Sequence, residues 1–74
     1  MDKPKAPLIG ANGNVFNLIG ITARTLRRNK VDQEIIQEFI NRVYKARNYD
    51  EALMIIWDYV EPVSREEIEM SQHE

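Results

Sequence analysis

The 74-residue chain has no cysteine, and its single histidine is His73, the residue before the last. Without thiols the chain forms no disulfide bond and no thiolate metal site. No histidine–carboxylate pair or carboxylate cluster has the spacing of a metal or catalytic centre. We therefore expect a protein without a metal, a cofactor or enzymatic activity.

Long hydrophobic runs are also absent, since every apolar segment is far shorter than the ~20 residues that cross a bilayer. The first residues lack the apolar stretch of a secretory signal. We expect a cytoplasmic protein that contacts no membrane. A chain of this length forms one domain with a modest core. It must pack efficiently as a helical bundle or share its core with another copy.

Charge is distributed unevenly along the chain, although the formal net charge is only −2. Residues 1–30 carry six lysines and arginines and one acid, whereas residues 31–74 carry four basic and eleven acidic residues. The two parts can neutralise each other within the fold or between copies. Internal neutralisation is favoured over a basic patch that faces outward.

Apolar residues recur at helical spacing in three segments of the chain. The spacing predicts helices at residues 14–29, 32–47 and 50–61. Each begins with a residue type that caps helices, namely Asn14, Asp32 and Asp50. The third segment is apolar around nearly its whole circumference, which is typical of a central helix or of an interface. With Leu53, Ile56 and Val60 facing the core, the expected interface residues are Met54, Ile55 and Trp57.

The segments on either side of this 14–61 core are predicted to lack regular packing. Residues 1–13 contain Pro4 and Pro7 and are expected to form an extended arm. Pairing of Leu8-Ile9 with Tyr59-Val60 is an alternative that we do not expect, because so short a strand is unstable alone. Residues 62–74 form an acidic tail with a short helix at 65–71 and disorder after it. The predicted fold is all-α: a small three-helix bundle with an extended N-terminal arm and a weak C-terminal fourth helix.

A turn rich in glycine and asparagine, at residues 10–14, leads into the first predicted helix. Such a turn presents backbone N–H groups at the positive end of the helix dipole, which favours an anion. The same helix carries two arginines four residues apart, a spacing that suits a phosphate or a carboxylate. The candidate anion-binding residues are Gly10, Gly13, Asn14, Asn17, Gly20, Arg24 and Arg28. A simple turn before a solvated helix face has the same composition, and such a turn is the more common explanation of this pattern.

The segment 22–28, with the sequence TARTLRR, also has the character of a nucleic-acid recognition helix. Two observations oppose this interpretation. The acidic second part of the chain repels phosphates unless its acids face away from the helix. A helix-turn-helix also has another helix before its recognition helix, whereas here an arm precedes it.

Several short motifs occur together in the chain. They are Leu8-Ile9-Gly10 followed by Gly13-Asn14, Phe16 and Gly20, then Arg24-x-Leu26, Tyr49-Asp50-x-x-Leu53 and Tyr59-Val60-Glu61. This pattern, over about residues 8–61, resembles a group of short bacterial proteins of unassigned function associated with phages, plasmids and integrated elements. The resemblance implies a small stand-alone accessory or counter-defence factor, with its glycines and Asn14 in a shared signature. Pro62 and the acidic tail depart from the pattern of the group.

The sequence leaves three functions open. The first is a non-enzymatic interaction module of a mobile element that associates with itself or with a protein partner through the third helix. The second is a binding or sequestering protein for a small anionic ligand such as a nucleotide or phosphate. The third is a regulator that binds nucleic acid through the basic helix.

Overall fold

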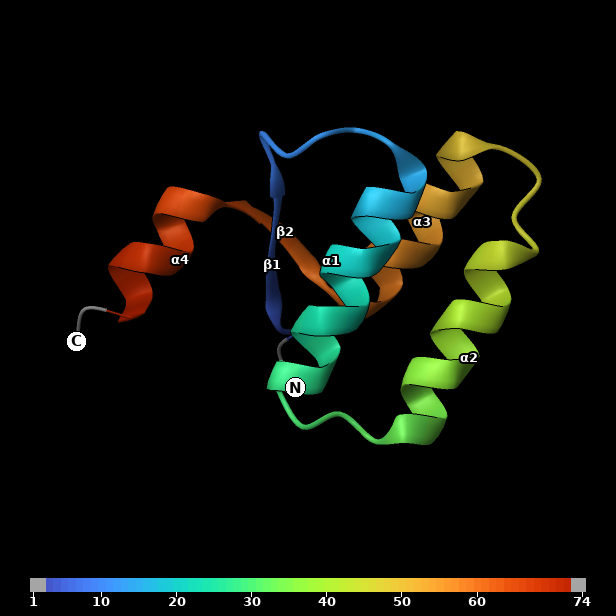
Figure 1. Ribbon diagram of the computed structural model, residues 1–74, viewed down its shortest axis with the longest axis horizontal. Helices are drawn as coiled ribbons and strands as arrows, with labels where there is room; N and C mark the ends of the chain where they lie inside the picture. Colours follow the sequence, from blue (N-terminus) through green and yellow to red (C-terminus); the bar gives the residue numbers. More distant parts are fainter. Residues whose placement is uncertain (1–2, 73–74) are drawn as a thin grey trace.

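The computed structural model describes the backbone of residues 3–72 and the side chains of residues 3–68. Over that range the chain forms two strands and four helices (Figure 1). In chain order they are β1 (Lys5–Ile9), α1 (Val15–Arg28), α2 (Gln33–Tyr44), α3 (Tyr49–Tyr59), β2 (Glu61–Ser64) and α4 (Arg65–Gln72). None of the helices in this range is long and apolar enough to cross a membrane.

The predicted all-α fold is wrong, because a parallel two-stranded sheet joins the two ends of the helical region. β1 was expected to be part of an extended arm, and β2 was assigned to the end of the third helix and the acidic tail. The paired residues are Lys5 with Glu61, Ala6 with Pro62, and Ile9 with Ser64. β1 therefore contains one more residue than β2 between the last two pairs, which is a bulge. The protein is a small α+β fold.

Proline explains why the strands were not predicted. Pro7 lies in β1 and Pro62 in β2, and a proline has no N–H to donate to a strand ladder. In a sheet of two strands each strand has one unpaired edge, so a proline is tolerated where no donor is needed. From the sequence alone, the same two prolines indicate an arm and the end of a helix. The partner of each strand lies at the other end of the chain.

The ends of α1 are fixed by local hydrogen bonds. The side chain of Asn14 accepts a hydrogen bond from a backbone N–H of the first turn at 2.9 Å, so the expected cap is confirmed. At the other end, the Lys30 N–H donates to the Arg27 carbonyl at 3.0 Å. The Val31 N–H donates to the Leu26 carbonyl at 3.1 Å, which completes a Schellman motif. Lys30 adopts the left-handed conformation that this motif requires, with φ of 58°.

The starts of the other two core helices differ from the prediction in detail. Asn48 rather than Asp50 caps α3, and its side chain accepts the Glu51 N–H at 2.8 Å. Asp50 lies inside the first turn, where its negative charge is favourable because it opposes the helix dipole. Asp32 occupies the cap position of α2 as expected, but its side chain makes no capping hydrogen bond.

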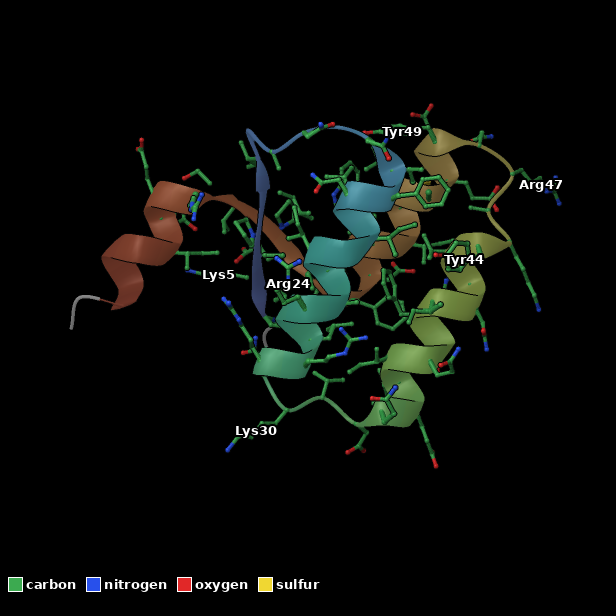
Figure 2. All side chains as sticks on the ribbon, viewed as in Figure 1. Lys5, Arg24, Lys30, Tyr44, Arg47 and Tyr49 are labelled. Carbon is green, nitrogen blue, oxygen red and sulfur yellow. The ribbon has the colours of Figure 1, made fainter. Side chains whose placement is uncertain are left out.

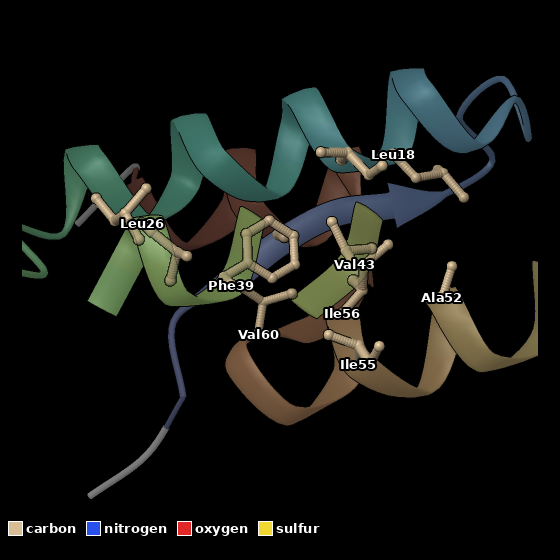
Figure 3. Close-up of a cluster of buried hydrophobic side chains, with 11 residues drawn as sticks. Leu18, Leu26, Phe39, Val43, Ala52, Ile55, Ile56 and Val60 are labelled. Carbon is tan, nitrogen blue, oxygen red and sulfur yellow. The ribbon is translucent and has the colours of Figure 1, made fainter. Parts of the chain in front are cut away.

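Most of the buried apolar side chains of the described residues form one cluster between the sheet and helices α1, α2 and α3 (Figure 3). Phe39 of α2 is fully buried, and its ring meets the Tyr59 ring edge-on with the centroids 5.2 Å apart. Ala6 of β1 and Val60 just before β2 are also fully buried. The strand pair is therefore part of the core, because Ala6 and Val60 belong to the buried cluster and β1 packs against α1.

The last helix, α4, contacts β1 and β2 and projects from the sheet, away from α2 and α3 (Figure 1). The capping box that predicted it is confirmed in part, because the Glu67 N–H donates to the Ser64 hydroxyl at 3.2 Å. The disorder expected after the helix falls on residues 73–74, which lie outside the described residues. Because α4 continues directly from β2, the pairing of β2 with β1 places α4 beside β1 and opposite α1.

Candidate anion-binding groove

A groove of about 710 Å³ lies between α1, β1 and the start of α4. This volume is within the range of small-molecule sites, which is ~300–1,000 Å³. Its apolar lining includes Pro7, Ile9, Ile21 and Ile68. Its basic lining consists of Lys5, Arg24, Arg28 and Arg65, and Figure 2 shows Lys5 and Arg24 on this side of α1. Three separate segments therefore bring four of the ten basic side chains of the chain to one place.

The positive charge of this basic groove is only partly neutralised by its neighbours. The Lys5 Nζ lies 3.8 Å from a carboxylate oxygen of Glu67, and both side chains are about half exposed. An ion pair so exposed and so long contributes little. No side chain among residues 3–68 forms an ion pair or a hydrogen bond with Arg24 or Arg28. Two guanidinium groups, each a planar fork of N–H donors, are thus open to an anion.

Local structure explains how each cation reaches the groove. Arg24 and Arg28 are one turn apart on α1, so their side chains start ~5–6 Å from each other on one face. Thr25 between them is buried, and its carbonyl accepts a hydrogen bond from the Asn29 side chain at 2.8 Å, which fixes the end of the helix. Lys5 is at the start of β1 and Arg65 at the start of α4, so strand pairing sets their positions.

The glycine–asparagine turn before α1 does not form the anion cradle that its sequence suggests. Its polar groups are used within the turn itself: the Asn12 side chain accepts the Asn14 N–H at 2.9 Å. The Asn17 side chain donates to the Asn12 carbonyl at 2.8 Å. The Tyr49 hydroxyl donates to the Gly13 carbonyl at 2.6 Å, so this turn also anchors α3. A Cβ at position 13 would lie in ordinary contact with that hydroxyl oxygen, at 3.4 Å, so the hydrogen bond does not itself require glycine.

The predicted anion site is thus divided between two places in the structure. Gly10, Arg24 and Arg28 line the basic groove. Gly13, Asn14 and Asn17 belong to the turn, and Gly20 lies exposed on α1 with open space around its Cα. Arg24 lies eight positions after Phe16, which is ~12 Å along the axis of α1. One small phosphate therefore does not contact both the turn before α1 and the arginines near its end.

Sequence reasoning did not identify Lys5 and Arg65 as site residues. Lys5 was assigned to an arm and Arg65 to a weak helix in an acidic tail, so no local signal placed them together. The parallel register that sets Lys5 opposite Glu61 is the feature that brings both toward α1. No periodicity in the sequence indicates such a long-range pairing.

The predicted interface on α3 is only partly exposed. Met54 and Trp57 have 64% and 46% of their surface exposed, so a surface on this helix is apolar as expected. Ile55 is only 9% exposed and lies in the core, so it does not belong to that surface. The expected core position Leu53 is half-buried instead, because α3 is rotated so that Ala52, Ile55 and Ile56 face inward.

A polar network joins α2 to α3 near this surface. The Tyr59 hydroxyl donates to a Glu38 carboxylate oxygen at 2.8 Å and accepts from Arg42 at 3.1 Å. Arg42 also lies 3.2 Å from an Asp58 carboxylate oxygen. Burial raises the pKa of Tyr59 above its ordinary value, while the hydrogen bond from Arg42 opposes the rise. Every member of the network is used in bridging the two helices, so we assign it to stability.

The basic groove is suited to a ligand that combines negative charge with an apolar or aromatic part, because both kinds of side chain line it. Among the described residues, no three His, Cys, Asp or Glu side chains gather as metal ligands would. The groups that line the groove include guanidinium, ammonium and apolar side chains. No protein-family model, curated protein or solved structure matches the chain.

Proposed function

We propose that the protein is a non-enzymatic binding module that holds a phosphate-bearing ligand in the basic groove. The observation that supports this most is the convergence of Lys5, Arg24, Arg28 and Arg65 from three segments of the chain. Arg24 and Arg28 are the part of this cluster that no side chain of residues 3–68 neutralises, so a ligand of opposite charge would stabilise them. Arginine forks also match phosphate geometry better than any other side chain.

Thermal unfolding in the presence of inorganic pyrophosphate tests the proposal. A ligand that binds only the folded protein stabilises it by ~2.7 kcal/mol at a hundred times its Kd. Each 1 kcal/mol raises the Tm of a domain of this size by ~4–8 °C. We therefore expect pyrophosphate at saturation to raise the Tm by about 10 °C or more, and the rise to shrink as NaCl is added.

Charge-matched variants decide whether the groove is responsible. The double variant Arg24→Ala/Arg28→Ala should abolish the rise in Tm. Arg47→Ala removes one charge, and Arg47→Ala/Lys45→Ala removes the same two charges, from the α2–α3 loop, with Arg47 at the opposite end of the molecule (Figure 2); both should leave most of the rise in place. Equal effects of the Arg24/Arg28 and Arg47 changes, or no rise with pyrophosphate at any concentration, would show that the groove is not an anion site.

A second candidate function is self-association through α3, favoured by the exposed pair Met54 and Trp57. Exposed methionine and tryptophan are enriched at protein interfaces. The hollow beside them is also lined by charges of both signs, among them Lys45, Glu51 and Asp58. Such a mixed rim is self-complementary when two copies meet about a two-fold axis.

Sedimentation equilibrium over a range of concentrations tests this second function. Met54→Glu should shift the protein toward the monomer, whereas Phe16→Glu on the exposed face of α1 should not. Ile55 was also predicted to lie at the interface, but Ile55→Glu would unfold the core and is unsuitable as a test. A monomeric mass for the unmodified protein at every concentration would rule out self-association.

A further inference from the structure

We infer that the phosphate-bearing ligand is a single-stranded nucleic acid, whose bases stack on Phe16 and Tyr44 while its phosphates contact the arginines of α1. This inference rests on the proposed function and names the ligand class of the same basic surface. It uses a feature that lies outside the groove, an exposed aromatic pair at the other end of α1.

The exposed face of α1 carries no acidic and no aliphatic side chain. Its exposed positions are Phe16, Asn17, Gly20, Arg24, Arg27 and Arg28. The aromatic ring occupies the first turn and the three arginines the last turns, ~12–18 Å away along the axis. Gly20 between them leaves open space where another residue would place a side chain. The helix thus offers a flat track with a ring at one end and cations at the other.

The aromatic pair is unusually open for rings that contact each other. Phe16 and Tyr44 are 66% and 62% exposed, with their centroids 6.5 Å apart and their planes tilted by 40°. Rings packed for stability bury most of their surface, as Phe39 does in the core. Proteins that bind single-stranded nucleic acid without sequence preference combine exposed aromatic faces, on which the bases stack, with a basic track for the phosphates. Tyr49 lies at the same end of the molecule (Figure 2).

Amide side chains lie nearest to the aromatic pair on α2, and two acidic side chains lie farther around the helix. Going back along α2 from Tyr44, the helical neighbours on its side are Asn41, Gln37 and Gln33. The Gln37 side chain donates to the Asn41 side chain at 3.1 Å. Glu34 and Glu38 line the same hollow as these amides, and Glu38 accepts the hydrogen bond from Tyr59. The surface next to the rings is therefore rich in amides, which are groups that bind base edges, and carboxylates lie farther around the helix.

Two other ligand classes fit this surface less well. A duplex keeps its bases stacked inside, so it leaves the faces of Phe16 and Tyr44 unused. An acidic protein would complement the arginines and the apolar lining of the groove, but it would have no bases to stack on the open faces of Phe16 and Tyr44. An unstacked strand uses the rings, the amides and the arginines together.

Fluorescence anisotropy with a labelled oligothymidylate tests the inference, and inorganic polyphosphate as a competitor provides a polyanion without bases. Phe16→Ala and Tyr44→Ala should each weaken oligothymidylate binding by about tenfold or more. Neither change should alter the binding of polyphosphate. Trp57→Ala removes an exposed ring from α3 and should leave both unchanged. Circular dichroism of each variant confirms that it is folded.

The outcomes separate the inference from the proposed function. If Arg24→Ala/Arg28→Ala abolishes binding of both polyanions and the ring variants affect neither, the groove binds anions and the nucleic-acid inference is wrong. If a duplex or a polyglutamate competes as well as the oligothymidylate does, the inference is also wrong. If neither polyanion binds at low ionic strength, the proposed function and the inference fail together.

Discussion

Replacement of Phe39 by alanine is the sharpest test of the core described above. The Phe39 ring is fully buried at the centre of the cluster and meets the Tyr59 ring edge-on. Truncation of a buried phenylalanine costs ~3–5 kcal/mol, since the lost transfer energy adds to the cavity left behind. A domain of 74 residues has a total stability of about 4–11 kcal/mol. Phe39→Ala should therefore remove about a quarter or more of the stability, or unfold the protein.

The matched control is Phe16→Ala, which makes the same chemical change at a ring that is 66% exposed. We expect it to cost less than about 1 kcal/mol, because little apolar surface returns to water. Urea denaturation followed by circular dichroism gives both free energies of unfolding, with the m-value as a check on two-state behaviour. Equal losses for the two variants, or a loss below about 1.5 kcal/mol for Phe39→Ala, would refute the packing described for α2.

Three further predictions concern the ends of the helices and pH. Lys30→Gly should raise the free energy of unfolding by up to ~1 kcal/mol, because glycine adopts the left-handed conformation at that position without strain; a lower Tm would contradict this. Asn48→Ala should lower the free energy of unfolding, measured by urea denaturation, by ~1 kcal/mol, and Asp50→Ala should lower it less, because Asn48 is the cap of α3. The reverse order would show that Asp50 is the cap, as the sequence predicted. Because burial raises the pKa of Tyr59, the folded state holds the phenol proton more tightly than the unfolded state does. The resulting stabilisation of the folded protein is complete below pH ~10 and is lost as the pH rises through the folded pKa. Tyr59→Phe should flatten the fall in stability above that pH, which urea denaturation at a series of pH values measures.

Much of the helical structure could be predicted from the sequence. Residues 14–29, 32–47 and 50–61 were predicted as helices, and helices occupy Val15–Arg28, Gln33–Tyr44 and Tyr49–Tyr59. Local chemistry explains this success, because apolar periodicity and short-range capping are written in adjacent residues. The predicted cap was wrong where two residues of similar type lie close together, as Asn48 and Asp50 do at the start of α3.

The candidate site was only partly visible in the sequence. Arg24 and Arg28 could be assigned to one face because helical spacing alone places them there. The glycine–asparagine turn appeared to belong with them, but its hydrogen bonds close on the turn itself and on Tyr49. Such a long-range contact has no periodic signature, so the sequence could not separate a turn from a site.

The sequence by itself therefore determined the helices, the arginine face of α1 and the absence of thiol chemistry, since each depends on composition or on neighbours within a few turns. Only the tertiary structure decided that β1 pairs with β2, that α3 buries Ile55 while exposing Trp57, and that Lys5 and Arg65 join Arg24. The physical reason is that strand pairing and helix rotation are set by the packing of the whole core. Residues at opposite ends of the chain share that core, and no short segment contains the information.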